Sequence, residues 1–176
     1  MDYPHWRRGL AAAMIVIIAS ALTAASAPIR QKPGQLPDEL VGLAKIEKIT
    51  VTARPLDEVL IDAGLTRERV RELAVALLVD AGFEVVEDNE QVPNLTYSVE
   101  IITSETLPDI FGFVCFVDLY QLVHIPRLER DLVMPTSTLL QHDIRRESGL
   151  KETIEASIEF ITERFIKVER MANEEL

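Results

Sequence analysis

The most apolar stretch outside the N-terminus, Ile110–Ile125 (IFGFVCFVDLYQLVHI), most constrains the fold of this chain. Its density of Phe, Val, Tyr and Ile favours an extended strand. It is shorter than the roughly 20 residues that a membrane helix needs, and Asp118 and Gln121 interrupt it. We therefore predict that it forms the long central strand of a sheet, with the other elements packed on or beside it.

A charged loop at 126–131 separates this strand from a predicted returning strand at 132–145. If the hairpin is centred near Leu128–Glu129, opposed residue numbers sum to about 257, because loop length fixes the register. This register places Cys115 opposite His142. It predicts one apolar hairpin face made of Phe111, Phe113, Cys115, Val117, Leu119, Val123, Leu132, Met134, Leu140 and Ile144. Pro135 predicts that the returning strand is an edge strand or is bulged.

Two amphipathic helices are predicted from apolar residues at spacings of three and four. The first, Thr66–Ala81, begins at a threonine suited to an N-cap and precedes Gly82, which suits the C′ position. The second begins at Ser148 and runs to about Arg170. On the first helix, Arg67, Arg69 and Arg71 lie away from the apolar stripe, and we predict a solvated face for them.

Three further strands complete the predicted sheet, at 45–53, 83–87 and 94–103. The last alternates apolar and polar residues with period two, which is typical of a half-buried antiparallel strand. The predicted order is therefore β-α-β-β-β-β-α. We expect an α+β domain in which two amphipathic helices pack on one face of a mostly antiparallel sheet of four or five strands.

The N-terminus has the pattern of an export signal. Residues 1–8 end in two arginines, and Gly9–Ala27 contains no charged residue. Ala25, Ser26 and Ala27 form the predicted cleavage region, and a cut after Ala25 or Ser26 avoids leaving Pro28 directly after it. The same uncharged run could instead remain as a membrane anchor, since about 20 apolar residues span a bilayer. No cysteine lies near this region to carry a lipoprotein anchor.

We therefore divide the chain into four segments. These are a signal peptide or anchor at 1–27, a proline-rich linker at 28–44, a single domain at 45–170 and a frayed tail at 171–176. Both interpretations of the leader predict an exported protein of the periplasm or cell envelope, and contact with the membrane only if the leader is retained.

Charge and cysteine content restrict the partners. The formal net charge is −11, and such a surface repels phosphate backbones, so nucleic acid and anionic lipid are poor partners. Cys115 is the single cysteine of the chain, so no disulfide can form within it. The folded domain must therefore rely on its hydrophobic core.

The sequence contains no recognisable catalytic or metal-binding pattern. Nucleophile-elbow, metalloprotease, phosphate-loop and dinucleotide motifs are missing, and no zinc spacing or cofactor motif occurs. The one exception is the predicted Cys115–His142 pair, because a thiol beside an imidazole can act as nucleophile and base. A small thiol-dependent hydrolase is thus the alternative function, although Cys115 is predicted to lie on the core face.

Several segments resemble those of uncharacterised exported bacterial proteins with one small α/β domain. They are AGL at 63–65, AGFEVV at 81–86, LTYSVEI at 95–101, DLYQLVHIPR at 118–127 and a closing helix with phenylalanines at its centre. The element order is also similar to that of the TolB N-terminal domain and of the curli-secretion lipoprotein family. These resemblances imply a protein-interaction module and no catalytic residues. The chain departs from the group in lacking a Thr-Trp pair in the returning strand.

The predicted function is therefore a non-enzymatic binding or assembly module outside the cytoplasm. With both helices on one side, the other face of the sheet would be exposed and available to an envelope protein or a second copy. The candidate residues for this interaction alternate along the central strand: Phe116, Asp118, Tyr120, Leu122 and His124.

Overall fold

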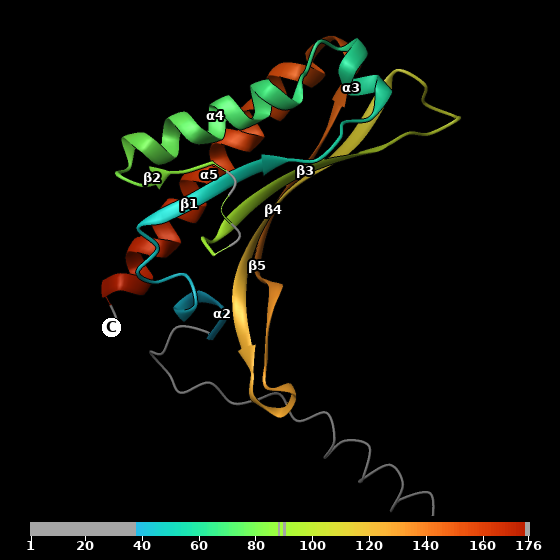
Figure 1. The fold of residues 1–176 in the computed structure, drawn as a ribbon. Coiled ribbons are helices and arrows are strands. Elements are labelled where there is room, and N and C mark those ends of the chain that lie inside the picture. The colour runs from blue at the N-terminus through green and yellow to red at the C-terminus, as the bar shows by residue number, and fades with distance from the viewer. Residues whose placement is uncertain (1–37, 88, 90, 175–176) are drawn as a thin grey trace, which may run out of the picture. The chain divides into compact units, whose positions relative to one another are not determined.

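The computed structural model describes residues 38–174 except 88 and 90 (Figure 1). The predicted leader, its cleavage region and most of the predicted linker lie outside these residues. The helices are α2 (Asp38–Val41), α3 (Glu58–Asp62), α4 (Arg67–Asp80) and α5 (Leu150–Glu174). The strands are β1 (Lys48–Ala53), β2 (Glu84–Val85), β3 (Asn94–Ile102), β4 (Ile110–Ile125) and β5 (Arg130–Arg146). Within this part of the chain, no helix is long and apolar enough to cross a membrane.

The five strands form one sheet in the order β2-β1-β3-β4-β5. The predicted α+β class, element order and mostly antiparallel sheet are confirmed, with a parallel part at β1 that makes the sheet mixed. The strand β1 pairs in parallel with both β2 and β3, whereas β3, β4 and β5 are antiparallel neighbours. The parallel β1–β2 pair follows from α4, because a helical crossover returns the chain in its original direction.

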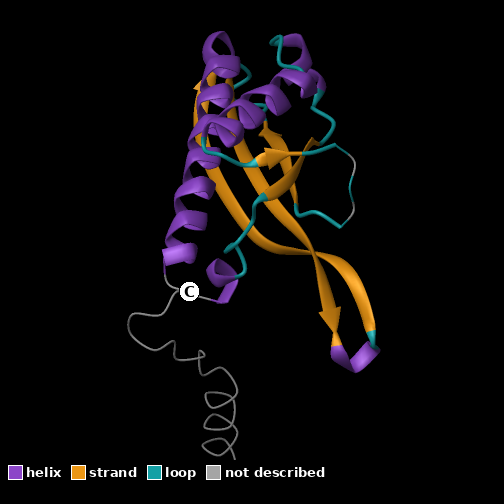
Figure 2. Ribbon diagram, turned by 60° about the vertical axis from the view of Figure 1, so that its left-hand side comes forward, coloured by secondary structure: helices purple, strands orange, loops and turns teal. Residues whose placement is uncertain are grey.

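Helices α4 and α5 cover one face of the sheet (Figure 2). Alternate residues of the central strands are buried beneath them, including Leu95, Tyr97 and Val99 of β3. The β4 partners in this layer are Phe111, Phe113, Cys115, Val117 and Leu119. The core also takes in Leu43, ahead of β1, and Ala172 near the end of α5. The backbone N–H of Lys45 donates to Asn173 Oδ1 at 2.7 Å, which joins these two ends of the domain.

The predicted boundaries of α4 are confirmed by its caps. Thr66 accepts a hydrogen bond from the backbone N–H of Arg69, and Gly82 follows the helix with a φ of +97°. A glycine is favoured there because a positive φ strains residues that carry a Cβ.

The three arginines of α4 stay at the surface, with Arg67 and Arg69 exposed as predicted, but each also makes a specific contact. Arg69 forms an ion pair with Glu155 of α5 at 3.0 Å. Their hydrogen bond raises the pKa of Arg69 and lowers the pKa of Glu155. Arg67 and Arg71 donate to the backbone carbonyls of Ala53 and Val51. β2 pairs only with the first residues of β1, so the carbonyls of Val51 and Ala53 have no strand beside them. The two arginines supply the hydrogen bonds that a neighbouring strand would otherwise provide.

The predicted hairpin register is wrong by one position in the body of the sheet and by two positions near the tip. Cys115 lies opposite Gln141, and His142 lies opposite Val114. The strands close around a tighter tip, in which Glu129 takes a left-handed φ of 48°. A bulge between Leu119 and Tyr120 then shifts the pairing again. The predicted position of β5 at the edge, with an irregularity near Pro135, is confirmed.

This register shift matters because side chains alternate between the two faces of a strand. Leu140 and Ile144, which were predicted to join the buried hairpin face, instead project from the opposite side of the sheet. Both are substantially exposed, at 47% and 65%. Beyond the bulge, the β4–β5 ribbon extends past the helices as a two-stranded arm (Figures 1 and 2).

Candidate functional site: the uncovered face of the sheet

The face of the sheet opposite α4 and α5 is not covered by any described helix, and we call it the uncovered face. Its side chains are the alternate residues that point away from the two helices. They include Thr52 of β1 and Arg54 directly after it; Asn94, Thr96, Ser98, Glu100 and Ile102 of β3; Gly112, Val114, Phe116, Asp118, Tyr120, Leu122 and His124 of β4; and Val133, Thr138, Leu140, His142 and Ile144 of β5.

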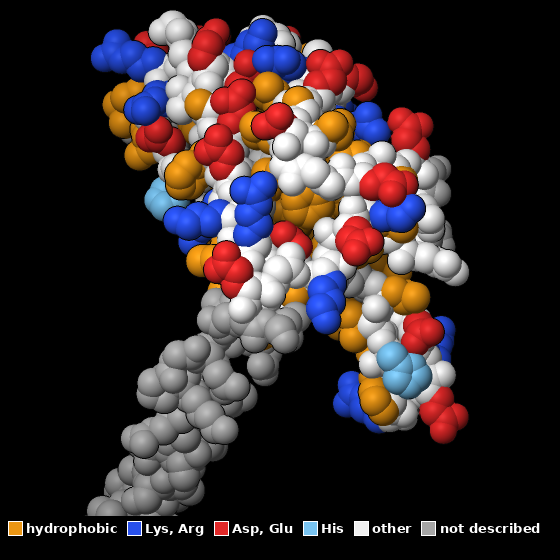
Figure 3. Space-filling model, turned by 90° about the vertical axis from the view of Figure 1, so that its left-hand side faces the viewer, with side chains coloured by type: hydrophobic (Ala, Val, Ile, Leu, Met, Phe, Trp, Pro, Cys, Tyr) orange, Lys and Arg blue, Asp and Glu red, His pale blue; other side chains and the backbone are white. Residues whose placement is uncertain are grey.

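All five predicted interaction residues lie on this face, but three of them already have polar partners. Asp118 accepts from Thr138 Oγ1 at 2.6 Å, which links β4 to β5. Tyr120 accepts from Arg54 at 3.0 Å. His124 Nδ1 lies 2.8 Å from Asp131 Oδ1 near the tip of the arm. The end of the arm projects from the body and carries charged side chains (Figure 3).

The two apolar candidates lie opposite apolar residues of β5. Phe116 is half-buried and pairs with Leu140, while Leu122 pairs with Val133. Leu122 and Val133 are 50% and 56% exposed, so the arm carries an apolar pair on this face.

An apolar groove of about 390 Å³ lies at the opposite end of the uncovered face from the arm. Gly112 forms part of its floor, because the glycine leaves a gap between Ile102 and Ile144, its partners on the two neighbouring strands. Leu107 contributes from the preceding loop. Ile102 and Leu107 are 60% and 52% exposed. Sequence reasoning missed this groove, because it needed the true register of β5 and the position of a loop.

A larger cleft of about 740 Å³ lies at the β1 side of the same face. We call it the polar cleft. Thr52, Asn94 and Thr96 form part of its lining and bond to one another, with distances of 3.0–3.1 Å. Arg54 and Tyr120 line it as well. Of these residues the sequence predicted only Tyr120, since no motif marks the others.

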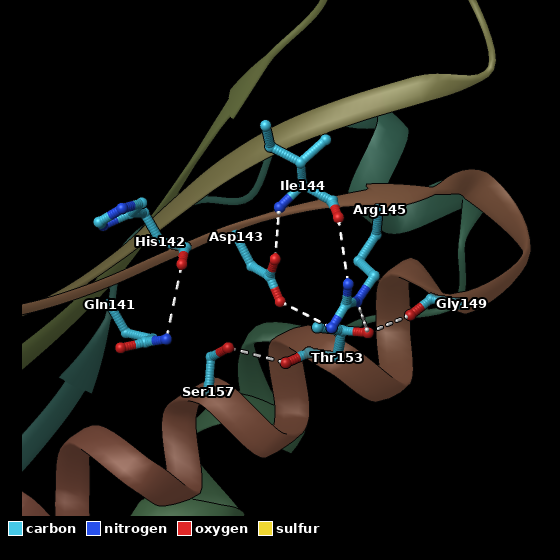
Figure 4. A network of polar contacts seen from close by, with 8 residues as sticks. All are labelled: Gln141, His142, Asp143, Ile144, Arg145, Gly149, Thr153 and Ser157. Carbon is cyan, nitrogen blue, oxygen red and sulfur yellow. Dashed lines mark hydrogen bonds and ion pairs between the residues drawn. The ribbon is translucent and has the colours of Figure 1, made fainter.

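The outer edge of β5 is partly closed by its own side chains (Figure 4). Asp143 accepts from the backbone N–H of Ile144 at 2.7 Å, while Gln141 and Arg145 donate to the carbonyls of His142 and Ile144. Arg145 is held by an ion pair with Asp143 and by Thr153 of α5. These bonds occupy backbone groups that a further strand would need, so this part of the edge is protected from strand addition.

The Cys115–His142 pair does not form. Cys115 is fully buried beneath the helices, whereas His142 lies on the uncovered face. Burial raises the pKa of the Cys115 thiol to about 12. In the described part of the chain, no group of three metal-ligating side chains comes together.

Cys115 is therefore expected to be unreactive in the native protein. A thiolate is the reactive species, and both the raised pKa and the burial suppress it. Ellman's reagent at pH 8 should detect almost no thiol in the folded protein and one per chain in denaturant. Comparable reaction rates in the two states would contradict this placement of Cys115.

No protein-family model and no curated protein matches the sequence. Among solved structures, the chain is similar to a minor lipoprotein from Acinetobacter baumannii, with 9% identity, a TM-score of 0.41 and coverage of 70% of this chain and 90% of that one. It is also similar to rare lipoprotein B from Shewanella oneidensis, with 12% identity, a TM-score of 0.39 and coverage of 68% and 91%. The chain is similar as well to a PelC dodecamer from Paraburkholderia phytofirmans, with 14% identity, a TM-score of 0.40 and coverage of 69% of this chain and 88% of that one. Likenesses this distant assign neither a family nor a function.

Proposed function

We propose that this protein is a non-enzymatic binding or assembly module outside the cytoplasm, which acts through the uncovered face of its sheet. The observation that carries the proposal is the exposure of apolar side chains from the two strands that flank β4. Ile102, Leu140 and Ile144 lie on β3 and β5 at either side of β4, and each is 47% exposed or more. Clustered apolar residues of this kind mark interaction surfaces more often than scattered ones do.

The polar contacts at the sheet edges favour the face over the edges as the site of binding. Arginines of α4 bond carbonyls on the β1 side, and side chains of β5 bond their own backbone. Strand addition requires free backbone groups, whereas face-to-face docking requires exposed side chains. The export signal predicted at 1–27 supports an envelope protein or a second copy of the chain as the partner.

The proposal is tested by placing a charge on the uncovered face. Leu140→Asp should abolish the crosslinked species formed in the envelope fraction of the source cells, because burying a carboxylate in an apolar interface is costly. Its melting temperature should stay close to that of the parent, since Leu140 is exposed. Crosslinked products are identified by mass spectrometry, and self-association is measured by sedimentation of the purified protein.

Phe160→Asp is the matched control. Phe160 is 50% exposed, close to the value for Leu140, but it lies on α5 and outside the uncovered face. It should leave the crosslinked species unchanged. If both variants lose the partner equally, or neither does, the uncovered face is not the binding surface.

A further inference from the structure

In the lining of the polar cleft, the threonine hydroxyl hydrogens already form hydrogen bonds, whereas the side-chain amide hydrogens of Asn94 do not. The Thr52 and Thr96 hydroxyls lie 3.1 and 3.0 Å from Asn94 Oδ1 and 3.0 Å from each other, so their two hydrogens are used within this cluster. The Asn94 side-chain oxygen is thereby occupied from two sides. The two N–H groups on Asn94 Nδ2 have no bonded partner among the described residues, so they remain available to a ligand.

Arg54 and Tyr120 add further unused donors next to Asn94. Asn94 and Tyr120 lie directly opposite each other on β3 and β4, so their side chains are neighbours. Arg54 Nη2 donates to the Tyr120 hydroxyl oxygen at 3.0 Å. The phenol therefore keeps its own hydrogen, and the other N–H groups of Arg54 have no partner in the described part of the chain. Within that part, Arg54 also forms no ion pair.

The charged side chains in the described part of the lining favour an anion. Among these residues, Arg54 and Arg71 are cationic and Glu87 is the one carboxylate. Glu87 already forms an ion pair with Arg71, in which Glu87 Oε1 lies 3.3 Å from Arg71 Nη2. Asp118, the next carboxylate along β4, accepts a hydrogen bond from Thr138 on the β5 side. Among the described lining residues, Arg54 is thus a positive charge without a carboxylate partner, on a chain whose net charge is −11.

We propose that the polar cleft binds an oxyanion, a phosphate or carboxylate group carried by a small polar molecule, through Arg54, Asn94 and Tyr120. Charged and neutral donors that lie side by side are a usual means by which proteins hold such groups. The volume of about 740 Å³ suits a molecule larger than the anion itself. This proposal deepens the proposed function, on which it rests, because the cleft opens on the same uncovered face.

The test is a titration of the purified full-length chain with inorganic phosphate and, separately, with acetate. Binding is followed through the side-chain N–H resonances of Arg54 and Asn94 in a nitrogen-15 NMR spectrum. Phosphate or acetate should shift both resonances. Arg54→Gln should weaken binding about tenfold or more, because a hydrogen bond to a charged group is lost. Arg54→Lys should weaken it less, since the charge remains while the planar fork does not.

Arg127→Gln is the matched control, because it removes the same charge from an exposed arginine in the turn between β4 and β5. It should change the affinity less than twofold. Stronger binding of phosphate than acetate identifies a phosphate-bearing ligand, and the reverse identifies a carboxylate. Competition between phosphate and phosphatidylglycerol vesicles identifies a lipid headgroup as the source, and its absence identifies a soluble one.

The proposal is overturned if neither anion shifts the Arg54 and Asn94 resonances, or if Arg54→Gln and Arg127→Gln weaken binding equally. The proposed function can survive that result, because partner crosslinking is tested independently through Leu140→Asp.

Discussion

Replacing Phe165 with alanine is expected to lower the free energy of unfolding by about 3–5 kcal/mol, the usual cost of removing a buried phenyl ring. Phe165 is 2% exposed and lies in the layer between α5 and the sheet. Its ring centroid is 6.0 Å from that of Phe83, which precedes β2. The substitution thus opens a cavity between elements that are distant in the sequence. Urea unfolding followed by circular dichroism measures the effect.

Phe160 is the internal control on the same helix. Because its side chain is half exposed, Phe160→Ala should change the free energy of unfolding by no more than about 0.5 kcal/mol. Similar losses for the two variants would show that the buried stripe of α5 is assigned to the wrong face of the helix.

Thr162→Val is expected to destabilise the domain by about 1–3 kcal/mol, although it changes the shape of the side chain very little. The Thr162 hydroxyl donates to the Ile158 carbonyl at 2.7 Å and accepts from the Tyr97 hydroxyl at 2.8 Å. Valine would leave the buried Tyr97 hydroxyl without an acceptor. Burial raises the pKa of Tyr97, so its hydroxyl stays protonated and needs an acceptor.

Tyr97→Phe separates two energies: that of the lost hydrogen bond between Tyr97 and Thr162, and the cost of burying a Tyr97 hydroxyl that has no acceptor. It removes the donor cleanly and leaves the Thr162–Ile158 bond in place, so about 0.5–1.5 kcal/mol should be lost. The double variant should be more stable than Thr162→Val alone, because no phenol then remains unsatisfied. A double variant that is less stable than both single variants would contradict this account. Thermal and urea unfolding of the four proteins completes the cycle.

The candidate site was only partly accessible from the sequence. Alternation along β4 placed Phe116, Asp118 and Tyr120 on one face, and the structure agrees. It did not reveal that Asp118 would be bonded to Thr138 or Tyr120 to Arg54, since those partners come from other strands. Arg54 directly precedes Pro55, where no motif or periodicity marks it as a site residue.

The sequence alone determined the elements whose causes are local. The apolar density of Ile110–Ile125 predicted β4, and the cap at Thr66 with Gly82 predicted α4, because strand propensity and helix capping depend on neighbouring residues. Apolar residues at spacings of three and four likewise predicted α5 as an amphipathic helix.

The tertiary structure decided the register of the hairpin and everything that depends on it. One left-handed residue at Glu129 and one bulge beside Tyr120 moved Leu140 and Ile144 to the uncovered face and separated Cys115 from His142. The parallel pairing of β2 with β1 likewise depended on where α4 returned the chain to the sheet. These outcomes arise from contacts between distant segments, and a shift of a single residue reverses which face a side chain occupies.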